Sequence, residues 1–137
     1  MHRVALSLSA LALVAACSRP APQQQQAAGP GPHWVIVVLY HQPKDTAAFE
    51  RYYFGTHLPL AASVKEEVGF TRAVFVKFTH NLDGSRPAYY RKAELWFDSE
   101  AALQGGIATP GFKKIGDDFK NFVTGGLTAL VSVESPK

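Results

Sequence analysis

A histidine beside a helix-breaking proline is the side chain best suited to chemistry in this sequence. His57 follows Tyr53 by about one helical turn, and Pro59 lies just beyond it. Imidazole titrates near neutrality, so one histidine can both accept and donate a proton within a turnover. Because proline lacks a backbone donor, the helix is predicted to kink near residues 55–57 and to turn His57 inward. The alternative is a structural histidine that bonds to a neighbouring carbonyl and holds the kink.

Tyrosines placed around this histidine could orient it or contact a ligand. Tyr53 shares a helical face with His57, because residues four apart on a helix are neighbours. Tyr40 ends the first apolar run, on the side of its alternating core residues, where a phenol could donate to a substrate carbonyl. We therefore expect His57, Tyr53 and Tyr40 to form a catalytic set. Aromatic stripes also occur as plain core packing, so that interpretation stays open for both tyrosines.

The other candidate ligand-binding residues include a carboxylate in an otherwise apolar strand. Glu94 and Trp96 alternate with Lys92 on one side of that strand. A carboxylate in such a position must be paired, solvated or functional. If this side faces the helices, Glu94 could orient His57, whereas on a subunit interface it is expected to pair with Arg72 or Lys92. The predicted ligand-binding residues are Tyr52, Phe75, Glu94 and Trp96.

The pattern of apolar residues predicts the elements that position these side chains. Strands are expected at 34–40, 70–79, 89–97 and 127–133, and helices after Asp45, from Ser99 to Gln104, and from Pro110 to Val123. Gly105-Gly106 is expected to separate the last two helices, and Asp83-Gly84 to make a tight hairpin. The order β-α-β-β-α-β is that of a ferredoxin-like α+β domain, with one antiparallel sheet and helices on one face.

The first strand is apolar on both of its sides. Ile36 and Val38 alternate with Val37 and Leu39. The helices can cover only one face of the sheet, so the second face also needs a cover. Sheet-to-sheet pairing of two copies into an α/β barrel is the predicted solution.

The N-terminus has the features of an export signal. Residues 1–16 combine a short basic end, an apolar run too short to cross a ~30 Å hydrocarbon core, and small residues. Val14-Ala15-Ala16-Cys17 resembles the lipobox of bacterial lipoproteins, which implies that Cys17 is a lipid anchor. Residues 17–32 are predicted to form a disordered tether, and 33–137 the domain. Ser18 after the anchor implies the outer membrane, facing the periplasm. The alternative is an ordinary secretory signal with a coincidental cysteine.

The composition of the chain argues against several other classes of function. The chain has 137 residues, 47% of them hydrophobic, which suits one domain with a core. A net charge of +3 with dispersed basic residues argues against nucleic-acid binding. Cys17 is the only cysteine, and no histidines or carboxylates cluster at ligand spacing, so neither a disulfide nor a metal site is expected. No cofactor is predicted, although one histidine would suffice as an axial ligand for haem.

The segment from Phe49 to Ala61 is similar to the signature helix of the EthD family, within the dimeric α/β-barrel superfamily. Its pattern is Phe-x-x-Tyr-Tyr followed by His-x-Pro-Leu-Ala. The strand ending in Tyr40 and the stretch Pro110-Gly111-Phe112 also resemble the family. The resemblance extends over residues 35–133. It implies a homodimer in which each subunit keeps a pocket between its sheet and its helices, suited to a small hydrophobic ligand.

The resemblance implies several functions that this domain could share with related proteins. Family members are often labelled reductases, and related barrels include cofactor-free monooxygenases and lactone isomerases. We therefore expect a small aromatic or lactone-like substrate and proton transfer or oxidoreduction assisted by His57. A nicotinamide-dependent reductase is disfavoured, because the sequence has no Gly-x-Gly-x-x-Gly turn. The alternatives are a non-catalytic dimer that binds a hydrophobic ligand, and an interaction protein whose pocket is filled by its own side chains.

Overall fold

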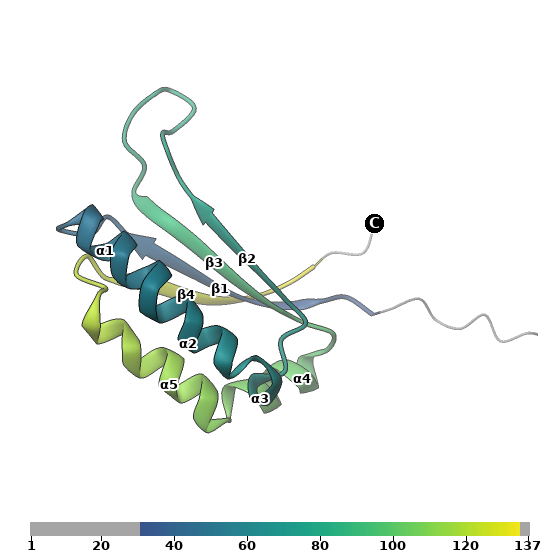
Figure 1. Cartoon of the computed structure of the whole chain (residues 1–137). Coiled ribbons are helices and arrows are strands. Elements are labelled where there is room, and N and C mark those ends of the chain that lie inside the picture. Colours follow the sequence, from purple (N-terminus) through teal and green to yellow (C-terminus); the bar gives the residue numbers. More distant parts are fainter. Residues whose placement is uncertain (1–30, 135–137) are drawn as a thin grey trace, which may run out of the picture.

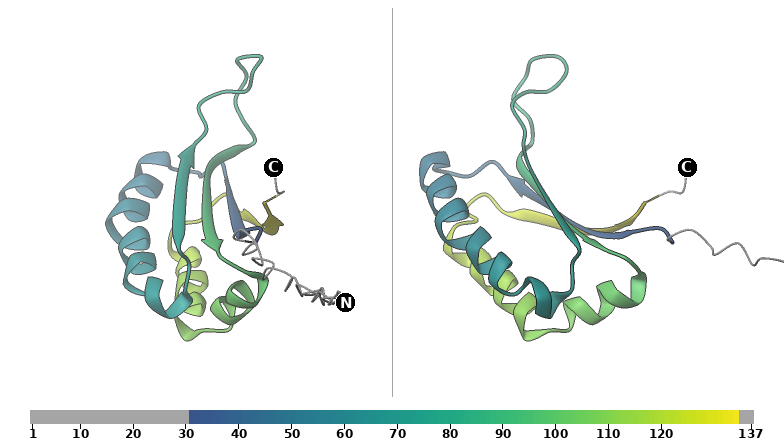
Figure 2. Two further views of the ribbon diagram at one scale, coloured as in Figure 1. Left: turned by 90° about the vertical axis from the view of Figure 1, so that its right-hand side faces the viewer. Right: turned by 45° about the vertical axis from the view of Figure 1, so that its right-hand side comes forward.

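The computed structural model describes residues 31–134, and the export signal, Cys17 and most of the tether lie outside them. A four-stranded antiparallel sheet with strand order β2-β3-β1-β4 forms one layer. Helices cover one face of it (Figures 1 and 2). The strands are β1 (Trp34–His41), β2 (Arg72–Lys77), β3 (Tyr89–Phe97) and β4 (Leu127–Val133). This arrangement confirms the predicted ferredoxin-like α+β fold.

The helices follow the predicted order with different boundaries. They are α1 (Thr46–Tyr52), the π-helical turn η1 (Tyr53–His57), α2 (Leu58–Ser63), α3 (Lys65–Val68), α4 (Glu100–Ile107), α5 (Pro110–Asp118) and the 3₁₀ turn η2 (Phe119–Asn121). Asp45 caps α1 by accepting a 2.9 Å hydrogen bond from the Ala48 amide. Among residues 31–134, no helix combines the length and apolar character needed to span a membrane.

The irregularity predicted near residues 55–57 is a single π-helical turn. The Leu58 amide donates to the Tyr53 carbonyl, five residues back, where an α-helix would bond four back. Pro59 lacks an amide proton, so this turn forms where the regular ladder is already interrupted. The wide turn buries Tyr53 and His57 together. π-Helical turns of this kind often occur at functional sites.

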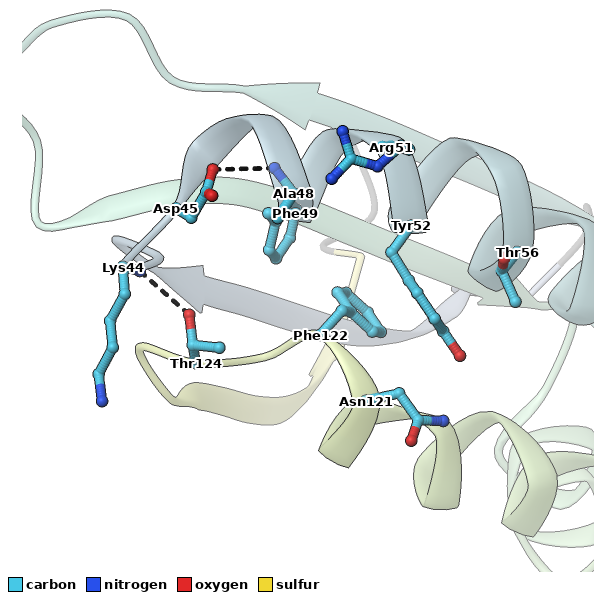
Figure 3. Close-up of a pocket in the computed structure, with 10 residues that line it drawn as sticks. All are labelled: Lys44, Asp45, Ala48, Phe49, Arg51, Tyr52, Thr56, Asn121, Phe122 and Thr124. Carbon is cyan, nitrogen blue, oxygen red and sulfur yellow. Dashed lines mark hydrogen bonds between the residues drawn. The ribbon is translucent and has the colours of Figure 1, made fainter.

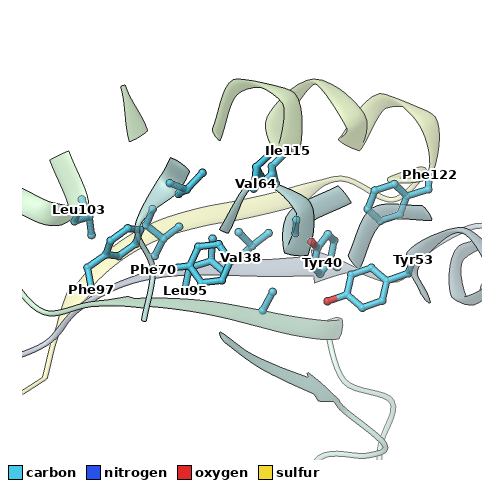
Figure 4. Close-up of a cluster of buried hydrophobic side chains, with 14 of the residues drawn as sticks. Val38, Tyr40, Tyr53, Val64, Phe70, Leu95, Phe97, Leu103, Ile115 and Phe122 are labelled. Atoms are coloured by element: carbon cyan, nitrogen blue, oxygen red, sulfur yellow. The ribbon is translucent and has the colours of Figure 1, made fainter. Parts of the chain in front are cut away.

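The core lies between the sheet and the helices. Ile36, Val38 and Tyr40 of β1 point toward the helices, and Val38 and Tyr40 stand opposite Ala93 and Arg91 of β3. One end of the core holds Phe97, Phe70 and Leu103, whereas aromatic rings gather around Tyr40 at the other end (Figure 4). The rings packed against Tyr40 are those of Phe49, Tyr53, Phe119 and Phe122.

Two predicted connections are wrong. The tight hairpin is replaced by a protruding arm, residues 78–88, that extends beyond the sheet (Figures 1 and 2). The ladder stops near Phe78 and Tyr90, and only the tip turns at Gly84 (φ 81°). Pro87 in the returning limb lacks an amide donor, which disfavours further pairing. Gly105-Gly106 does not break α4 either, since both glycines lie within it.

The second sheet face carries no helix (Figure 2). It presents alternate residues of every strand, among them Val37, Leu39, Val74, Val76 and Leu130. Leu130 is 51% exposed, and Val37 and Leu39 are only partly buried. The apolar second face predicted from β1 is therefore present and open in the single chain.

Candidate functional site

A buried histidine–aspartate pair lies where η1 meets the end of α5. His57 Nδ1 is 2.9 Å from Asp118 Oδ2, and the two residues are 3% and 8% exposed. Tyr52 and Asn121 each donate a 2.8 Å hydrogen bond to the other carboxylate oxygen, Oδ1. These bonds fix the carboxylate from both sides. Asp118 in turn selects the imidazole tautomer that carries its proton on Nδ1.

Burial decides the charge of this pair. Removal from water lowers the pKa of His57, although the hydrogen bond and charge of Asp118 oppose the change. For Asp118, partial burial acts to raise the pKa, but hydrogen bonds from Asn121, His57 and Tyr52 outweigh it and lower the value. At neutral pH the pair is therefore a neutral imidazole that donates to an ionised carboxylate. Its Nε2 lone pair is available as a base.

Because the pKa of His57 is lower in the folded protein, acid should weaken the fold. In the unfolded chain the His57 imidazole takes up a proton near pH 6.5, whereas in the folded protein it does so only at lower pH. The contribution of neutral His57 to the unfolding free energy is therefore fully present above pH 6.5 and decreases as the pH falls below it. We expect a loss of about 1 kcal/mol in unfolding free energy between pH 7.5 and 5.5, before the carboxylates titrate. Denaturant melts of the wild type and of His57→Gln measure this difference. A wild-type protein that gains stability over this interval would contradict the assignment of a neutral imidazole.

Two tyrosines pack against the imidazole of His57. The Tyr40 hydroxyl is 3.5 Å from His57 Nε2, a long contact, and the Tyr53 ring stacks on the imidazole at 5.7 Å between centroids. The Tyr53 hydroxyl is buried close to that of Tyr40, and its own proton has no acceptor among the described residues. Burial raises the pKa of Tyr40 far above its usual range and that of Tyr53 to about 12, so both phenols stay protonated. A buried donor without an acceptor is costly, which suggests a ligand atom at this position.

A charged cluster supports the far side of Tyr53. Arg91, only 7% exposed, donates to Glu50 at 2.6 Å through Nη2, and Tyr90 and Lys77 also contact this carboxylate. Partial burial opposes ionisation of Glu50, but its bonds to Arg91, Tyr90 and Lys77 lower the pKa to about 2. The Arg91 guanidinium lies 5.3 Å from the Tyr53 ring centroid. This arrangement presents fixed positive charge beside the unpartnered hydroxyl.

The structure brings some predicted site residues together and separates others. His57, Tyr53 and Tyr40 meet in one cluster, Tyr52 reaches it through Asp118, and Phe75 packs edge-on against Tyr53 at 6.3 Å. Glu94 and Trp96 lie on the open sheet face, away from His57. There Glu94 pairs with Lys92 at 2.6 Å and accepts from the Trp96 indole. This is the arrangement expected for a strand side that faces away from the helices.

Sequence reasoning missed the partner of His57. Asp118 lies on α5 at helical spacing from two buried positions, Gly111 and Ile115, so a carboxylate interrupts a buried stripe. That position is the signal that could have found it, because a carboxylate there requires partners. Arg91 was missed for a related reason. Only the register of β3 shows that it faces the helices opposite Tyr40.

A groove lies next to two of the residues that hold Asp118, and Figure 3 shows the side chains that line it. It has a volume of about 340 Å³ and runs between α1 and the chain that links η2 to β4. Tyr52 and Asn121, the two additional donors to Asp118, line it. The groove therefore approaches the rear of the pair, whereas Nε2 faces Tyr40 on the other side.

The surroundings of His57 determine whether this side chain could bind the iron of a haem group. Its Nδ1 is engaged by Asp118, and Nε2 faces the Tyr40 hydroxyl within packed rings. An iron atom on Nε2 would have to displace the Tyr40 hydroxyl, so in the arrangement described here His57 has no open position for haem iron. Within residues 31–134, no three or more His, Cys, Asp or Glu side chains come close enough to hold a metal ion.

The fold and the site together define an α+β ferredoxin-like domain with a histidine-centred cluster between sheet and helices. Residues 41–126 match the EthD domain. The chain is also 31% identical over 99 residues to an uncharacterised 11.0 kDa protein from the thcB–thcC intergenic region of Rhodococcus erythropolis, covering 72% of this chain and 92% of that protein. The chain belongs to the EthD family.

Solved structures agree with this assignment. An EthD family protein from Bacillus halodurans superposes with a TM-score of 0.68 at 27% identity, covering 75% of this chain and 99% of that one. A dimeric ferredoxin-like protein of unknown function from Jannaschia sp. gives a TM-score of 0.56 at 14% identity, covering 73% of this chain and 97% of that one. The second likeness concerns the fold alone.

Proposed function

We propose that this domain catalyses proton transfer on a small hydrophobic carbonyl compound, with His57 as the general base and acid. The observation that carries the proposal is the set of polar atoms around Nε2. Asp118 holds His57 neutral, Nε2 has only a long 3.5 Å contact with the Tyr40 hydroxyl, and the buried hydroxyl of Tyr53, whose ring stacks on the imidazole, lacks an acceptor among the described residues. A base next to an unused hydrogen-bond donor is the arrangement that enolisation of a carbonyl compound requires.

The proposed reaction needs no oxidant or cofactor. The substrate carbonyl accepts a hydrogen bond from Tyr53 while His57 Nε2 removes a proton from the adjacent carbon. The electron pair of that C–H bond moves to the carbonyl oxygen, and the Tyr53 and Tyr40 phenols stabilise the resulting enolate. Asp118 stabilises the imidazolium that forms. Return of the proton to the opposite face of the same carbon, or to the γ-carbon when the substrate is β,γ-unsaturated and gives a dienolate, yields an isomer and restores the neutral imidazole, so atoms and charge balance.

The aromatic side chains around Tyr53 favour an apolar substrate entering from the β2 edge. Phe54 and Phe75 both contact the Tyr53 ring, and they are 53% and 41% exposed. Arg91 lies over the rings of Tyr53 and Phe54. His57 itself is almost fully covered. We therefore propose that Phe54 or Phe75 moves to admit substrate and that the Tyr40 hydroxyl moves away from Nε2, with Phe75 supporting the bound state.

The experiment uses the purified full-length protein and a panel of small aromatic ketones and lactones. Compounds that raise the melting temperature are then incubated with the protein in D₂O, and exchange at the α-carbon is followed by NMR. We expect exchange with the wild type and a loss of about 100-fold or more in His57→Ala. Tyr53→Phe, which keeps the ring and removes the hydroxyl, should retain the fold and lose about 10-fold or more.

The same experiment separates catalysis from simple binding. Compounds that stabilise both the wild type and His57→Ala, but never exchange, would leave a hydrophobic-ligand-binding dimer as the function. An exchange rate unaffected by His57→Ala in a folded protein would remove His57 from the mechanism. Matched melting curves of the unliganded variants show whether the fold is intact.

We also propose that the functional form is a homodimer joined through the open sheet face. The apolar side chains of that face support this, as do dimers among proteins of the same fold. Glu94, Lys92 and Trp96 would then lie at the subunit interface. Sedimentation of the wild type and of Leu130→Glu tests it, because an equal dimer content in both would contradict pairing through this face.

We further propose that Cys17 tethers the dimer to the bacterial outer membrane on its periplasmic side. The lipobox-like tetrad Val14-Ala15-Ala16-Cys17 and the Gln- and Pro-rich residues that follow support this placement. Mass spectrometry of the mature chain tests whether Cys17 is lipidated. A mature chain that begins at Cys17 without added acyl mass would contradict lipidation.

A further inference from the structure

The groove on the Asp118 side of the histidine pair has an aromatic floor. Phe49 and Phe122 are buried beneath it, 2% and 4% exposed. The Tyr52 ring stacks on Phe122 with centroids 5.3 Å apart and an interplanar angle of 15°. Figure 3 shows these rings between α1 and the η2 segment. A flat apolar ring is the group that such a floor accommodates.

The rim of the same groove carries a net positive charge, because its two cations outnumber its one carboxylate. Lys44 and Arg51 line it, and both are exposed. Neither has an ion-pair partner among residues 31–134. Asp45, the one carboxylate on the rim, accepts from the Ala48 amide as the cap of α1. Both cations are therefore available to an anion from outside.

A hydroxyl donor lies beside one of these cations. The Thr124 hydroxyl oxygen accepts a 3.0 Å hydrogen bond from the Lys44 amide, and its own proton has no recorded acceptor among the described residues. Thr124 lines the groove with Lys44 (Figure 3). A carboxylate placed here could accept from this hydroxyl and pair with the Lys44 ammonium, a charge-assisted arrangement.

We propose that this groove is a second ligand site, which takes a small amphipathic carboxylate. The ring lies on Tyr52 and Phe122, and the carboxylate meets Lys44 and Thr124, while Arg51 adds positive charge to the rim. This site is distinct from the proposed reaction site, because His57, Tyr40 and Tyr53 are not among the residues that line the groove. The proposal therefore does not depend on His57 acting as a base.

The test uses naphthalene-2-carboxylate and its neutral amide as matched probes. Each is titrated into the purified full-length protein by calorimetry, and backbone NMR signals locate the binding. We expect the carboxylate to bind at least about 10-fold more tightly than the amide. The largest shifts should fall on groove residues such as Ala48 and Asn121. The variant Lys44→Gln/Arg51→Gln should weaken carboxylate binding by about 10-fold or more, and added salt should weaken it too.

A control variant keeps the same net charge. Lys65→Gln/Lys114→Gln removes two cations outside the groove and should bind within about two-fold of the wild type. His57→Ala should also retain binding, which separates this proposal from the proposed reaction. Equal affinity for the two probes, no measurable binding of the carboxylate, or shifts confined to Phe54 and Phe75 would each overturn the proposal.

Discussion

Asp118→Asn is expected to reduce proton transfer by about 10³-fold or more while the protein stays folded. An amide at this position can donate through its nitrogen to His57 Nδ1, whereas the carboxylate can only accept. The imidazole would then carry its proton on Nε2, the atom that must act as the base. The substitution is nearly isosteric, and the amide oxygen can still accept from Tyr52 and Asn121. The main change is therefore the tautomer.

The loss is measured as the α-carbon exchange rate of a ligand identified by thermal shift. NMR of the ¹⁵N-labelled imidazole reports the tautomer directly, a signal that a merely structural role of Asp118 would not move. Asn121→Ala is the matched control, because it removes one donor to Asp118 and leaves the contact with His57. We expect it to lose less than about 10-fold. An altered tautomer with an unchanged exchange rate would show that the pair is not the proton-transfer device.

Gly106→Ala is expected to destabilise the fold by about 2–3 kcal/mol, although it places a better helix former within α4. A methyl group at Gly106 would stand 2.4 Å from the Val68 carbonyl oxygen and 2.9 Å from a ring carbon of Phe97. The first atom is backbone, and Phe97 is fully buried, so neither can yield without moving α3 or β3. The overlap outweighs the gain in helix propensity.

The neighbouring glycine supplies the control. A methyl group at Gly105 meets no atom within 4 Å, so Gly105→Ala should stabilise the protein by about 0.5–1 kcal/mol. Thermal melts of both variants compare the two effects. For a domain of this size, Gly106→Ala should lower the melting temperature by about 10 °C or more. Equal melting temperatures for the two variants would contradict the packing of α4 described here.

Features that depend on residues close together in the chain were predictable from the sequence, whereas contacts between distant segments were not. Strand and helix order was predictable because each element shows its own apolar period, and β3 and β4 have the predicted limits. Pro59 located the irregular turn, and a spacing of four residues placed Tyr53 with His57. These features depend on neighbours within one or two turns. The sequence by itself therefore determined the fold class, the family and the histidine at the centre of the site.

The tertiary structure alone decided which charged groups surround that histidine. Asp118 lies 61 residues from His57 in the chain, and the packing of α5 against η1 brings them together. The β-ladder register decided that Arg91 faces the helices and Glu94 faces away, because one residue of slip would exchange them. Gly105-Gly106 reads as a break in sequence, yet both glycines lie inside α4, where the close approach of Val68 and Phe97 leaves no room for a side chain at Gly106. Pairings between distant segments are set by packing and register, and residue type alone does not encode them.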